Sequence, residues 1–242
     1  MKALVLAAGK GTRLGELTRA TPKVLLPIGG EPLLAHTIRY LAHNGISEVA
    51  VNLHYFAEAI CQYLGNGSRF DVRIHYSFEE TLLGTAGAVK KLEAYLSESS
   101  DFLVIYGDLL IDQPLKQMIL FHKNVEAIAT LLLHKRAGSN SIVKMAPDGR
   151  IIAFEERPPE RDLTEIHWVN SGLQILNRRI MTYIPAGQHC DLPRDVYVPL
   201  AGIESLFGFP LSGTRIAIDS GQRYQEAQQA FASGRFQYKP ET

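Results

Sequence analysis

The chain has 242 residues and a mass of 26.9 kDa; 46% of its residues are hydrophobic and 21% are charged. This is ordinary composition for a folded soluble protein and excludes a disordered one. Lys plus Arg and Asp plus Glu each number 25, so the net charge is zero and the basic excess typical of nucleic-acid-binding proteins is absent. No apolar run reaches the about 18 residues that cross a bilayer, so we expect a cytoplasmic protein with neither a nucleic-acid nor a membrane partner.

Strand-like and helix-like segments alternate through the first half of the chain. Short apolar runs predict buried strands at 3–8, 48–55, 71–77 and 102–108. Apolar residues at helical spacing predict helices at 32–44 and 85–96. Such alternation indicates right-handed crossovers and an α/β fold with a doubly wound, mostly parallel (Rossmann-like) sheet flanked by helices.

The second half is more mixed and extends the predicted sheet. Strands are expected at 127–134 and 167–176, and two more lie within 141–156 around a Pro-Asp-Gly turn. A last strand leads to Ser220, which is a plausible N-cap for a terminal helix. No repeat or linker divides the chain, so we expect a single domain at residues 1–234 followed by a polar tail at residues 235–242.

A glycine-containing loop, within LVLAAGKGTRL, follows the first predicted strand. Gly9 and Gly11 let the backbone approach a ligand closely, and Arg13 carries a fixed positive charge. Successive main-chain N–H groups in such a turn bind anions, so a phosphate is the first expectation. Leu14 takes the place of the third glycine of a dinucleotide-binding motif, and the Walker A pattern is also absent. An ordinary solvated loop is the alternative.

Two aspartates follow predicted strands. Asp108 ends the strand at 102–108, and Asp219 follows the last strand. In open α/β sheets, ligands bind outside the carboxyl ends of the strands, where both aspartates and the glycine loop could meet. Two carboxylates tolerate nearby phosphates if a divalent ion bridges them, and oxygen ligands suit Mg²⁺. The combination predicts a nucleoside triphosphate site with Mg²⁺, although a lone aspartate more commonly caps the next turn.

A series of ordered motifs runs from the first residues nearly to the last helix. It begins with LAAGKGTRLGELTRATPKVLLPIGGEPLL, which contains G-x-G-T-R-L, P-K and L-P, and continues with LGTAGAV, YGD, FEERP, VNSG and IDSGQRY. This series resembles the sugar-1-phosphate nucleotidylyltransferases, also called nucleotide-sugar pyrophosphorylases. The resemblance implies that a sugar 1-phosphate attacks the α-phosphorus of an NTP in a Mg²⁺-dependent reaction and that pyrophosphate leaves. A homo-oligomer is also compatible with it, since oligomers are frequent in the family.

The resemblance implies roles for individual residues. The catalytic residues would be Arg13, Lys23 and Asp108, and the metal ligands Asp108 and Asp219. The nucleotide would be bound by Leu6, Ala8, Gly9, Gly11, Thr12, Arg13, Glu80, Gly84, Thr85 and Ala86. The sugar phosphate would be bound by Glu156, Arg157, Asn170 and Gly172.

Three positions depart from the family pattern. Arg157 stands where the family has lysine, which changes the reach and geometry of the phosphate contact. Arg215 or Ile216 stands where a tryptophan is common, and Ser141 where a small glycine often makes room for the sugar. The floor of the sugar pocket is therefore expected to differ.

The base is indicated by Glu79 and Glu80, which stand where thymidylyl enzymes tend to have glutamine. A carboxylate can accept both N1–H and N2–H₂ of guanine, which favours GTP. The motifs also look closest to guanylyltransferases for mannose or heptose 1-phosphate. Related uridylyl enzymes can carry glutamate here too, so thymidylyl or uridylyl transfer stays open, as does the alternative that both glutamates face water.

Two other functions are compatible with parts of the sequence. A glycosyltransferase would need aspartates two residues apart, whereas Asp108 and Asp112 are four apart. A regulatory homologue that binds a nucleotide sugar would be expected to lack Lys23 or the metal aspartates, which are all retained. We also expect no additional β-helix acetyltransferase domain.

Overall fold

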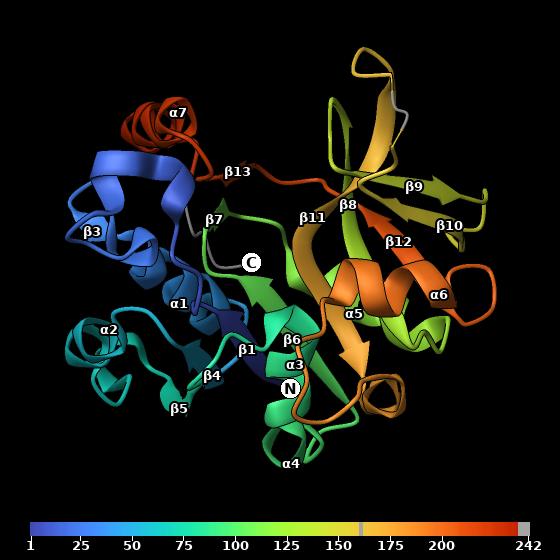
Figure 1. The fold of residues 1–242 in the computed structure, drawn as a ribbon, viewed down its shortest axis with the longest axis horizontal. Coiled ribbons are helices and arrows are strands. Elements are labelled where there is room, and N and C mark those ends of the chain that lie inside the picture. The colour runs from blue at the N-terminus through green and yellow to red at the C-terminus, as the bar shows by residue number, and fades with distance from the viewer. Residues whose placement is uncertain (160–161, 237–242) are drawn as a thin grey trace. The chain divides into compact units, whose positions relative to one another are not determined.

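The computed structural model describes residues 1–159 and 162–236 (Figure 1). The chain forms two compact units. Unit 1 comprises Met1–Leu82, Ile105–Pro114 and Ser212–Thr242, and unit 2 comprises Leu83–Val104 and Leu115–Leu211. Because both units are discontinuous in sequence, this division does not test the single domain expected at residues 1–234, which stays a prediction. Most of the predicted polar tail, residues 237–242, lies outside the described residues.

Unit 1 is built on a parallel sheet with the strand order β1-β4-β5. These strands are β1 (Lys2–Leu6), β4 (Glu48–Leu53) and β5 (Arg73–Phe78), and the crossover helices are α1 (Leu33–His43) and α2 (Ala57–Leu64). They are coloured from blue to cyan in Figure 1. Helix α1 forms where the sequence predicts it, because Leu34, Ile38 and Leu41 share a fully buried face. It stops before Gly45, whose φ of 75° lies in the left-handed region that favours glycine.

The remaining elements of unit 1 cover a second apolar cluster. They are the short strand pairs β2 (Pro27–Ile28) with β3 (Glu31–Pro32) and β7 (Leu109–Ile111) with β13 (Arg215–Ala217), the 3-10 helices η1 (Thr12–Thr18), η2 (Lys23–Leu25) and η3 (Ser68–Phe70), and helix α7 (Gly221–Ala232). Leu14, Leu110 and Ile218 are buried in this cluster. Ser220 caps α7 by accepting a hydrogen bond from the Arg223 N–H, which confirms the predicted helix start.

Unit 2 contains a mixed sheet with the order β10-β9-β11-β8-β12. These strands are β8 (Ala129–Ala137), β9 (Ser141–Met145), β10 (Ile151–Glu156), β11 (Ile166–Asn177) and β12 (Leu206–Pro210). Only β12 and β8 run parallel among them. The helices are α3 (Gly84–Lys91), α4 (Glu93–Leu96), α5 (Leu115–Asn124), η4 (Arg178–Tyr183), η5 (Leu192–Tyr197) and α6 (Val198–Leu200). Strand β6 (Asp101–Tyr106) begins in unit 2 and ends in unit 1.

The predicted α/β class, with a mixed and helix-flanked sheet, is confirmed. Two differences have local causes. Strand β1 ends at Leu6 rather than at Ala8, because the Ala7 N–H turns to the side chain of Asn52. The single helix predicted at 85–96 is divided into α3 and α4 at Leu92. Within the described residues, no helix is both long and apolar enough to cross a bilayer.

A buried histidine network in unit 2 gives a prediction about pH. His122 on α5 bonds Thr130 Oγ1 through Nδ1 at 2.8 Å, and its Nε2 lies 3.4 Å from Asp101 Oδ1. Asn177 donates to the same Asp101 oxygen at 2.7 Å. Burial lowers the pKa of His122 below its usual 6.5, and the neighbouring Asp101 only partly opposes this. The folded chain therefore binds this proton more weakly than the unfolded chain does.

We expect the free energy of unfolding to fall as the pH drops below about 6.5, because protonation of His122 then favours the unfolded chain. Urea unfolding at about pH 5.5 and about pH 7.5 measures this loss. The variant His122→Gln cannot titrate at this position, so its unfolding free energy should fall less between the two pH values. Equal losses in the two proteins would contradict the prediction.

Candidate active site

The glycine loop of unit 1 connects β1 to η1 and packs on Lys23. Gly11 has a φ of 69°, and a Cβ placed there would lie 2.8 Å from the Lys23 Cβ. Thr18 Oγ1 donates to the Gly11 carbonyl at 3.1 Å, which fixes the loop from the other side. Gly9 is exposed and a Cβ there would meet nothing within 4 Å. Glycine at position 11 is thus required by packing, whereas Gly9 leaves open space over the loop.

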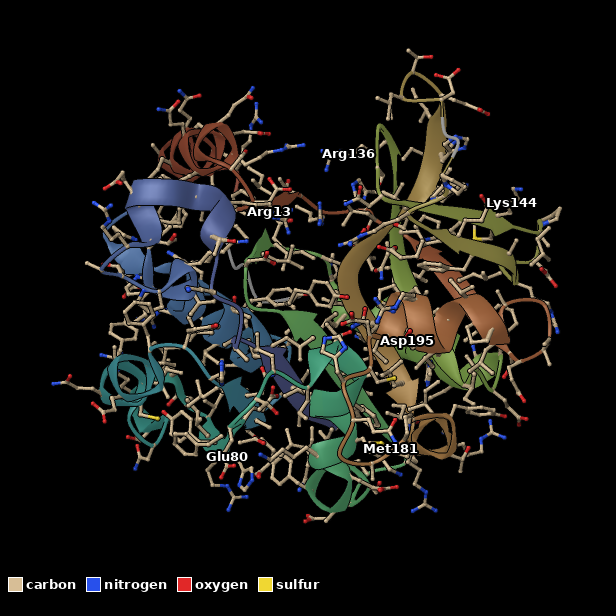
Figure 2. The ribbon with its side chains drawn as sticks, viewed as in Figure 1. Arg13, Glu80, Arg136, Lys144, Met181 and Asp195 are labelled. Atoms are coloured by element: carbon tan, nitrogen blue, oxygen red, sulfur yellow. The ribbon has the colours of Figure 1, made fainter. Side chains whose placement is uncertain are left out.

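A buried pair behind the loop fixes its start. Asn52 Oδ1 accepts the Ala7 N–H at 2.8 Å, and Asn52 Nδ2 donates to Glu79 Oε1 at 2.8 Å. Asn52 and Glu79 are 3% and 4% exposed. Because a buried polar group left without its hydrogen-bond partner is costly, these two bonds hold the end of β1 firmly. The alternative that both glutamates face water is therefore wrong for Glu79, while Glu80 is exposed (Figure 2).

Lys23 and Asp108, both predicted to be catalytic, form an ion pair. Lys23 Nζ lies 2.6 Å from Asp108 Oδ2, and the two side chains are 12% and 29% exposed. Lys23 begins η2 directly after Pro22, and Asp108 follows β6. The intervening Gly107 is needed because a Cβ there would lie 2.9 Å from the Leu6 carbonyl oxygen. The strand end thus carries a carboxylate whose charge is compensated by the lysine of the P-K motif.

Asp219 is brought next to Asp108 by backbone pairing. Strand β13 pairs with β7 so that Ala217 lies opposite Leu109. The ladder continues one residue further, where the Ile218 N–H donates to the Asp108 carbonyl at 2.9 Å. Asp219 is the next residue along the chain. Asp108, just before β7, and Asp219, just after β13, therefore lie at adjacent backbone positions of this antiparallel strand pair, and their role as metal ligands stays a prediction.

The chemistry of these two carboxylates fits a Mg²⁺ ion. Magnesium is commonly bound through one or two carboxylates, with phosphates and water supplying the other oxygens. Among the described residues, no group of three or more His, Cys, Asp or Glu side chains could enclose a metal ion. Two neighbouring aspartates are therefore suited to a divalent metal ion that arrives with a phosphate ligand.

The other predicted nucleotide residues of unit 1 surround the same loop. Arg13 is exposed on η1 (Figure 2), and Thr12 before it is also exposed. Leu6 is half-buried at the end of β1, and Ala8 is buried. Arg13 is therefore free to reach a ligand in solution, while Leu6 and Ala8 can offer mainly backbone groups.

Glu156 and Asn170 in unit 2 lie on either side of Ser141. In the β10–β9 register Glu156 is opposite Ser141, and Ser141 Oγ accepts the Asn170 N–H at 3.3 Å. Glu156 is half-buried, and burial raises the pKa of its carboxyl. Ser141 is 7% exposed, so the position where the family often has glycine is occupied by a hydroxyl bound to β11. The sugar-binding residues predicted on different strands are thus neighbours.

Arg157 has an unusual backbone conformation. Its φ is 53°, in the left-handed region that non-glycine residues rarely adopt, and its N–H donates to the Asn140 carbonyl at 2.6 Å. The side chain is 77% exposed, with Nε 3.7 Å from Glu156 Oε1. Such strained residues cluster at functional sites, and the guanidinium is accessible to a phosphate.

A bulge in β11 positions Asn170 and Gly172. The pairing of β11 with β8 shifts between Asn170 and Gln174, and Gly172 within this interval has a φ of 82°. Asn170 Oδ1 accepts the Gly172 N–H at 3.0 Å, which leaves the Asn170 amide nitrogen as a donor for a ligand. His134 Nδ1 bonds Ser171 Oγ at 2.8 Å beneath the bulge. Bulges of this kind re-aim side chains next to active sites.

The predicted nucleotide residues Gly84, Thr85 and Ala86 form the start of α3 in unit 2. Their backbone is engaged by residues 190 and 191: the Ala86 N–H donates to the Cys190 carbonyl at 2.8 Å and the Thr85 N–H to Asp191 Oδ1 at 3.1 Å. The first turn of α3 is thus held within unit 2. Their contact with a nucleotide stays a prediction.

Sequence reasoning missed several residues that shape these sites. Asn52 supports the glycine loop, His134 the β11 bulge, and Asp191 the start of α3. Asp195 on η5 (Figure 2) accepts two hydrogen bonds from Arg194, at 2.7 and 3.0 Å. The only signal in the stretch DLPRDVY was three charged residues within five positions of an otherwise apolar segment.

Comparisons with known proteins show which sequences and structures this chain is similar to. Residues 2–196 match the nucleotidyl transferase family. A UTP–glucose-1-phosphate uridylyltransferase from Synechocystis sp. is 34% identical over 214 residues, which cover 83% of this chain and 55% of that protein. A mannose-1-phosphate guanyltransferase from Yarrowia lipolytica is 32% identical over 218 residues, which cover 88% of this chain and 59% of that protein. The chain thus spans a little over half the length of these curated relatives.

A solved structure shows the same fold. The crystal structure of HddC from Yersinia pseudotuberculosis complexed with GMP-PN matches this chain with a TM-score of 0.80 at 24% identity. The match covers 95% of this chain and 99% of HddC. With the family match over most of the sequence, it confirms the resemblance inferred from the ordered motifs. The chain belongs to the nucleotidyl transferase family.

Proposed function

We propose that this chain transfers the nucleotidyl group of an NTP to a sugar 1-phosphate and releases pyrophosphate. The observation that carries this proposal is the 2.6 Å pair of Lys23 and Asp108 beneath the glycine loop, with Asp219 at the neighbouring strand end. Phosphoryl transfer depends on the alignment of the substrates and the neutralisation of charge more than on a protein nucleophile. A cation and two carboxylates that can bind a metal ion next to a phosphate-binding loop would supply both.

The reaction needs one bond to form and one to break. An oxygen of the sugar 1-phosphate attacks the α-phosphorus of the NTP, and the bond between that phosphorus and the bridging oxygen of the β-phosphate breaks, so that pyrophosphate leaves. Gly9 and Gly11 would let the loop amides contact the triphosphate, Arg13 would bind the leaving pyrophosphate, and Lys23 would lie near the α-phosphate. Asp108 and Asp219 would hold Mg²⁺, which when bound neutralises phosphate oxygens.

The residues of unit 2 would bind the sugar 1-phosphate. An ionised Glu156 accepts hydrogen bonds from sugar hydroxyls, and the Asn170 amide donates one. Arg157 would bind the sugar phosphate, and the absence of a side chain at Gly172 would leave room for the ring. Ser141 would lie at the floor between Glu156 and Asn170, where its hydroxyl replaces the small residue common in the family.

For the base we propose guanine, and for the sugar a mannose- or heptose-like 1-phosphate. Glu79 is buried and accepts a hydrogen bond from Asn52, whereas Glu80 is exposed. Glu80 is therefore the carboxylate that could accept the two adjacent donors of guanine. A relative named as a mannose-1-phosphate guanyltransferase supports this choice, although a relative named as a uridylyltransferase is also similar. Thymidylyl or uridylyl transfer to another sugar 1-phosphate is the alternative.

A substrate panel tests the proposal. The purified chain is mixed with Mg²⁺, each NTP in turn and a set of sugar 1-phosphates, and pyrophosphate release is followed. We expect release only when both substrates are present, and fastest with GTP and a mannose- or heptose-like 1-phosphate. Release with no pair would contradict the proposal and favour a regulatory nucleotide-sugar-binding protein. Donor-sugar transfer without pyrophosphate would instead indicate a glycosyltransferase.

Replacing Arg157 with lysine should leave kcat/KM for the sugar 1-phosphate within a few-fold of the parent value or raise it. The side chain is 77% exposed and makes one long contact to Glu156, so an ammonium can take its place without a packing defect. Steady-state kinetics measure the effect, with Arg157→Met as the uncharged comparison. A tenfold or larger loss in the lysine variant would show that the fork of the guanidinium is required.

A further inference from the structure

Three strand ends lie side by side in unit 1, and the middle one belongs to β4. Strands β1, β4 and β5 are parallel in this order, so their carboxyl ends share one edge of the sheet. The glycine loop follows β1, and the segment at 79–80 follows β5. Near the end of β4, Asn52 lies opposite Leu6 on one side and Ser77 on the other. A side chain at this position is therefore placed between the two segments.

Asn52 bonds to both segments. Its Oδ1 accepts the Ala7 N–H at 2.8 Å, and its Nδ2 donates to Glu79 Oε1 at 2.8 Å. All three residues are buried, so water does not compete for these groups. An amide offers an acceptor and a donor, which a bridge between an N–H and a carboxylate requires. Asn52 thus connects the start of the glycine loop to the residue that precedes Glu80.

The backbone of Glu79 is held by the same strand. Its N–H donates to the Leu53 carbonyl at 2.8 Å, which extends the pairing of β5 with β4 by one residue. Its carbonyl lies 2.7 Å from His54 Nδ1, and because a carbonyl can only accept, this ring nitrogen carries the proton. Glu80 follows directly and is exposed (Figure 2). The exposed carboxylate of Glu80 therefore extends from a backbone position that β4 and the turn after it fix.

We propose that Asn52 is a positioning residue for base selection, because it fixes Glu80 relative to the glycine loop. A base bound by Glu80 and a triphosphate bound by the loop then have the separation that one nucleotide can span. The proposal rests on the proposed function, which assigns the triphosphate to the glycine loop and the base to Glu80. If Asn52 only stabilised the fold, its removal would lower the melting temperature and leave the preference among NTPs unchanged. A positioning side chain must change that preference.

Ligand binding without a sugar 1-phosphate tests the two segments separately. Calorimetry with Mg²⁺ gives the Kd of inorganic tripolyphosphate, which measures binding at the loop, and of GTP, ATP, UTP and dTTP, which also measures binding at the base segment. We expect the parent to bind GTP at least about tenfold more tightly than ATP, since adenine lacks the two adjacent donors of guanine. A parent that binds all four NTPs equally would overturn the proposal.

Two variants break the bridge at different places. Glu79→Met removes one acceptor but leaves the bond between Asn52 and Ala7. The Kd of tripolyphosphate should then stay within about twofold, while the preference for GTP should fall to about threefold or less. Asn52→Leu removes both bonds with a side chain of similar size, so tripolyphosphate should also bind about tenfold more weakly. An undiminished preference for GTP in both variants would contradict the proposal.

A reciprocal exchange should restore the bridge with donor and acceptor reversed. When Asn52→Asp is combined with Glu79→Gln, the carboxylate at position 52 accepts the Ala7 N–H and also a hydrogen bond from the amide at position 79. The net charge of the chain is unchanged. We expect the preference for GTP to return to within about twofold of the parent value. A preference that stays as low as in Glu79→Met would reject the bridge.

Asn44→Leu is the matched control, because it applies the same substitution elsewhere in unit 1. Asn44 Nδ2 donates to the Tyr40 carbonyl at 2.9 Å at the C-terminal end of α1, before β4 begins. Every Kd should stay within about twofold of the parent value. A loss of NTP preference in this variant would show that any destabilising change in unit 1 has this effect and would overturn the specific role of Asn52.

These binding measurements do not depend on turnover, so the role of Asn52 and the transfer reaction can fail separately. If the variants lose the preference but no pair of NTP and sugar 1-phosphate releases pyrophosphate, the role of Asn52 in base selection stands and the transfer reaction is rejected. If transfer is found and both variants keep the parent preference, the reaction stands and the role of Asn52 is rejected. A parent that binds no NTP rejects both.

Discussion

Replacing Asp108 with asparagine will reduce pyrophosphate release at ordinary Mg²⁺ concentrations by at least about 10³-fold. The amide keeps the shape and one acceptor of the side chain but loses the charge that a divalent cation requires. Among the described residues, no group of three or more His, Cys, Asp or Glu side chains could hold the metal ion, so no further ligand of these types can replace Asp108. Because Asp108 lies at a strand end and its side chain is 29% exposed, the fold should be retained.

Initial rates of pyrophosphate release over a Mg²⁺ series test this prediction, together with a thermal melt. Asp112→Asn is the matched control, because Asp112 is on the same segment but bonds the Thr214 N–H at the base of β13. Its amide can still accept that hydrogen bond, so turnover should be nearly unchanged. Turnover within a few-fold of the parent in Asp108→Asn would show that the metal role is misplaced.

Replacing Lys23 with alanine will lower kcat by about 10²- to 10³-fold. The ammonium is the cation nearest to Asp108, at 2.6 Å, and is only 12% exposed, so its charge is poorly screened by water. Without this ammonium, the side chain at position 23 no longer neutralises the negative charge that develops on the α-phosphate during transfer. Alanine also removes the aliphatic stem on which the Gly11 loop packs, so part of the loss could come from the loop.

The variant Lys23→Met distinguishes charge from packing, because it keeps most of the stem and no ammonium. We expect its kcat to fall nearly as far as that of Lys23→Ala, with a smaller loss in melting temperature. Lys10→Met is the control, since Lys10 is an exposed loop lysine whose Nζ lies 5.2 Å from the Tyr55 ring centroid. If Lys23→Met retained the parent rate, the lysine would be a structural residue rather than a catalytic one.

The part of the site that follows strand ends could be predicted from the sequence. Short apolar runs place β1 and β6, and the residues directly after them, including Asp108, must emerge at the carboxyl edge of the sheet. Asp219 could not be placed in this way, because β13 pairs with β7 in a separate two-stranded sheet and only that pairing brings Asp219 next to Asp108. No periodic pattern marks Lys23, the lysine of the P-K motif, and only the family resemblance indicated its role. The structure adds that its ammonium pairs with Asp108.

The side chains that act through other residues could not be predicted. Glu79 lies in a charged loop-like stretch, and its burial depends on Asn52, which is 27 positions away. Asp191 reaches Thr85 across 106 positions. Hydrogen bonds of this span depend on how strands and helices pack in three dimensions, while sequence patterns report only the local period of burial. The strain at Arg157 is equally invisible, because no residue type marks a φ of 53° except glycine or asparagine.

In the proposed reaction this chain joins the α-phosphorus of an NTP to the phosphate of a sugar 1-phosphate. A radiolabel placed on the α-phosphorus of GTP, followed by chromatography of the products, tests it most directly. We predict that the label moves into a nucleotide sugar with one pyrophosphate released per product, only with a divalent cation, and that Asp108→Asn and Asp219→Asn both abolish the transfer. Label that stays in GTP, or appears only in free GDP or GMP, with every NTP and sugar 1-phosphate tried in this way would contradict the account.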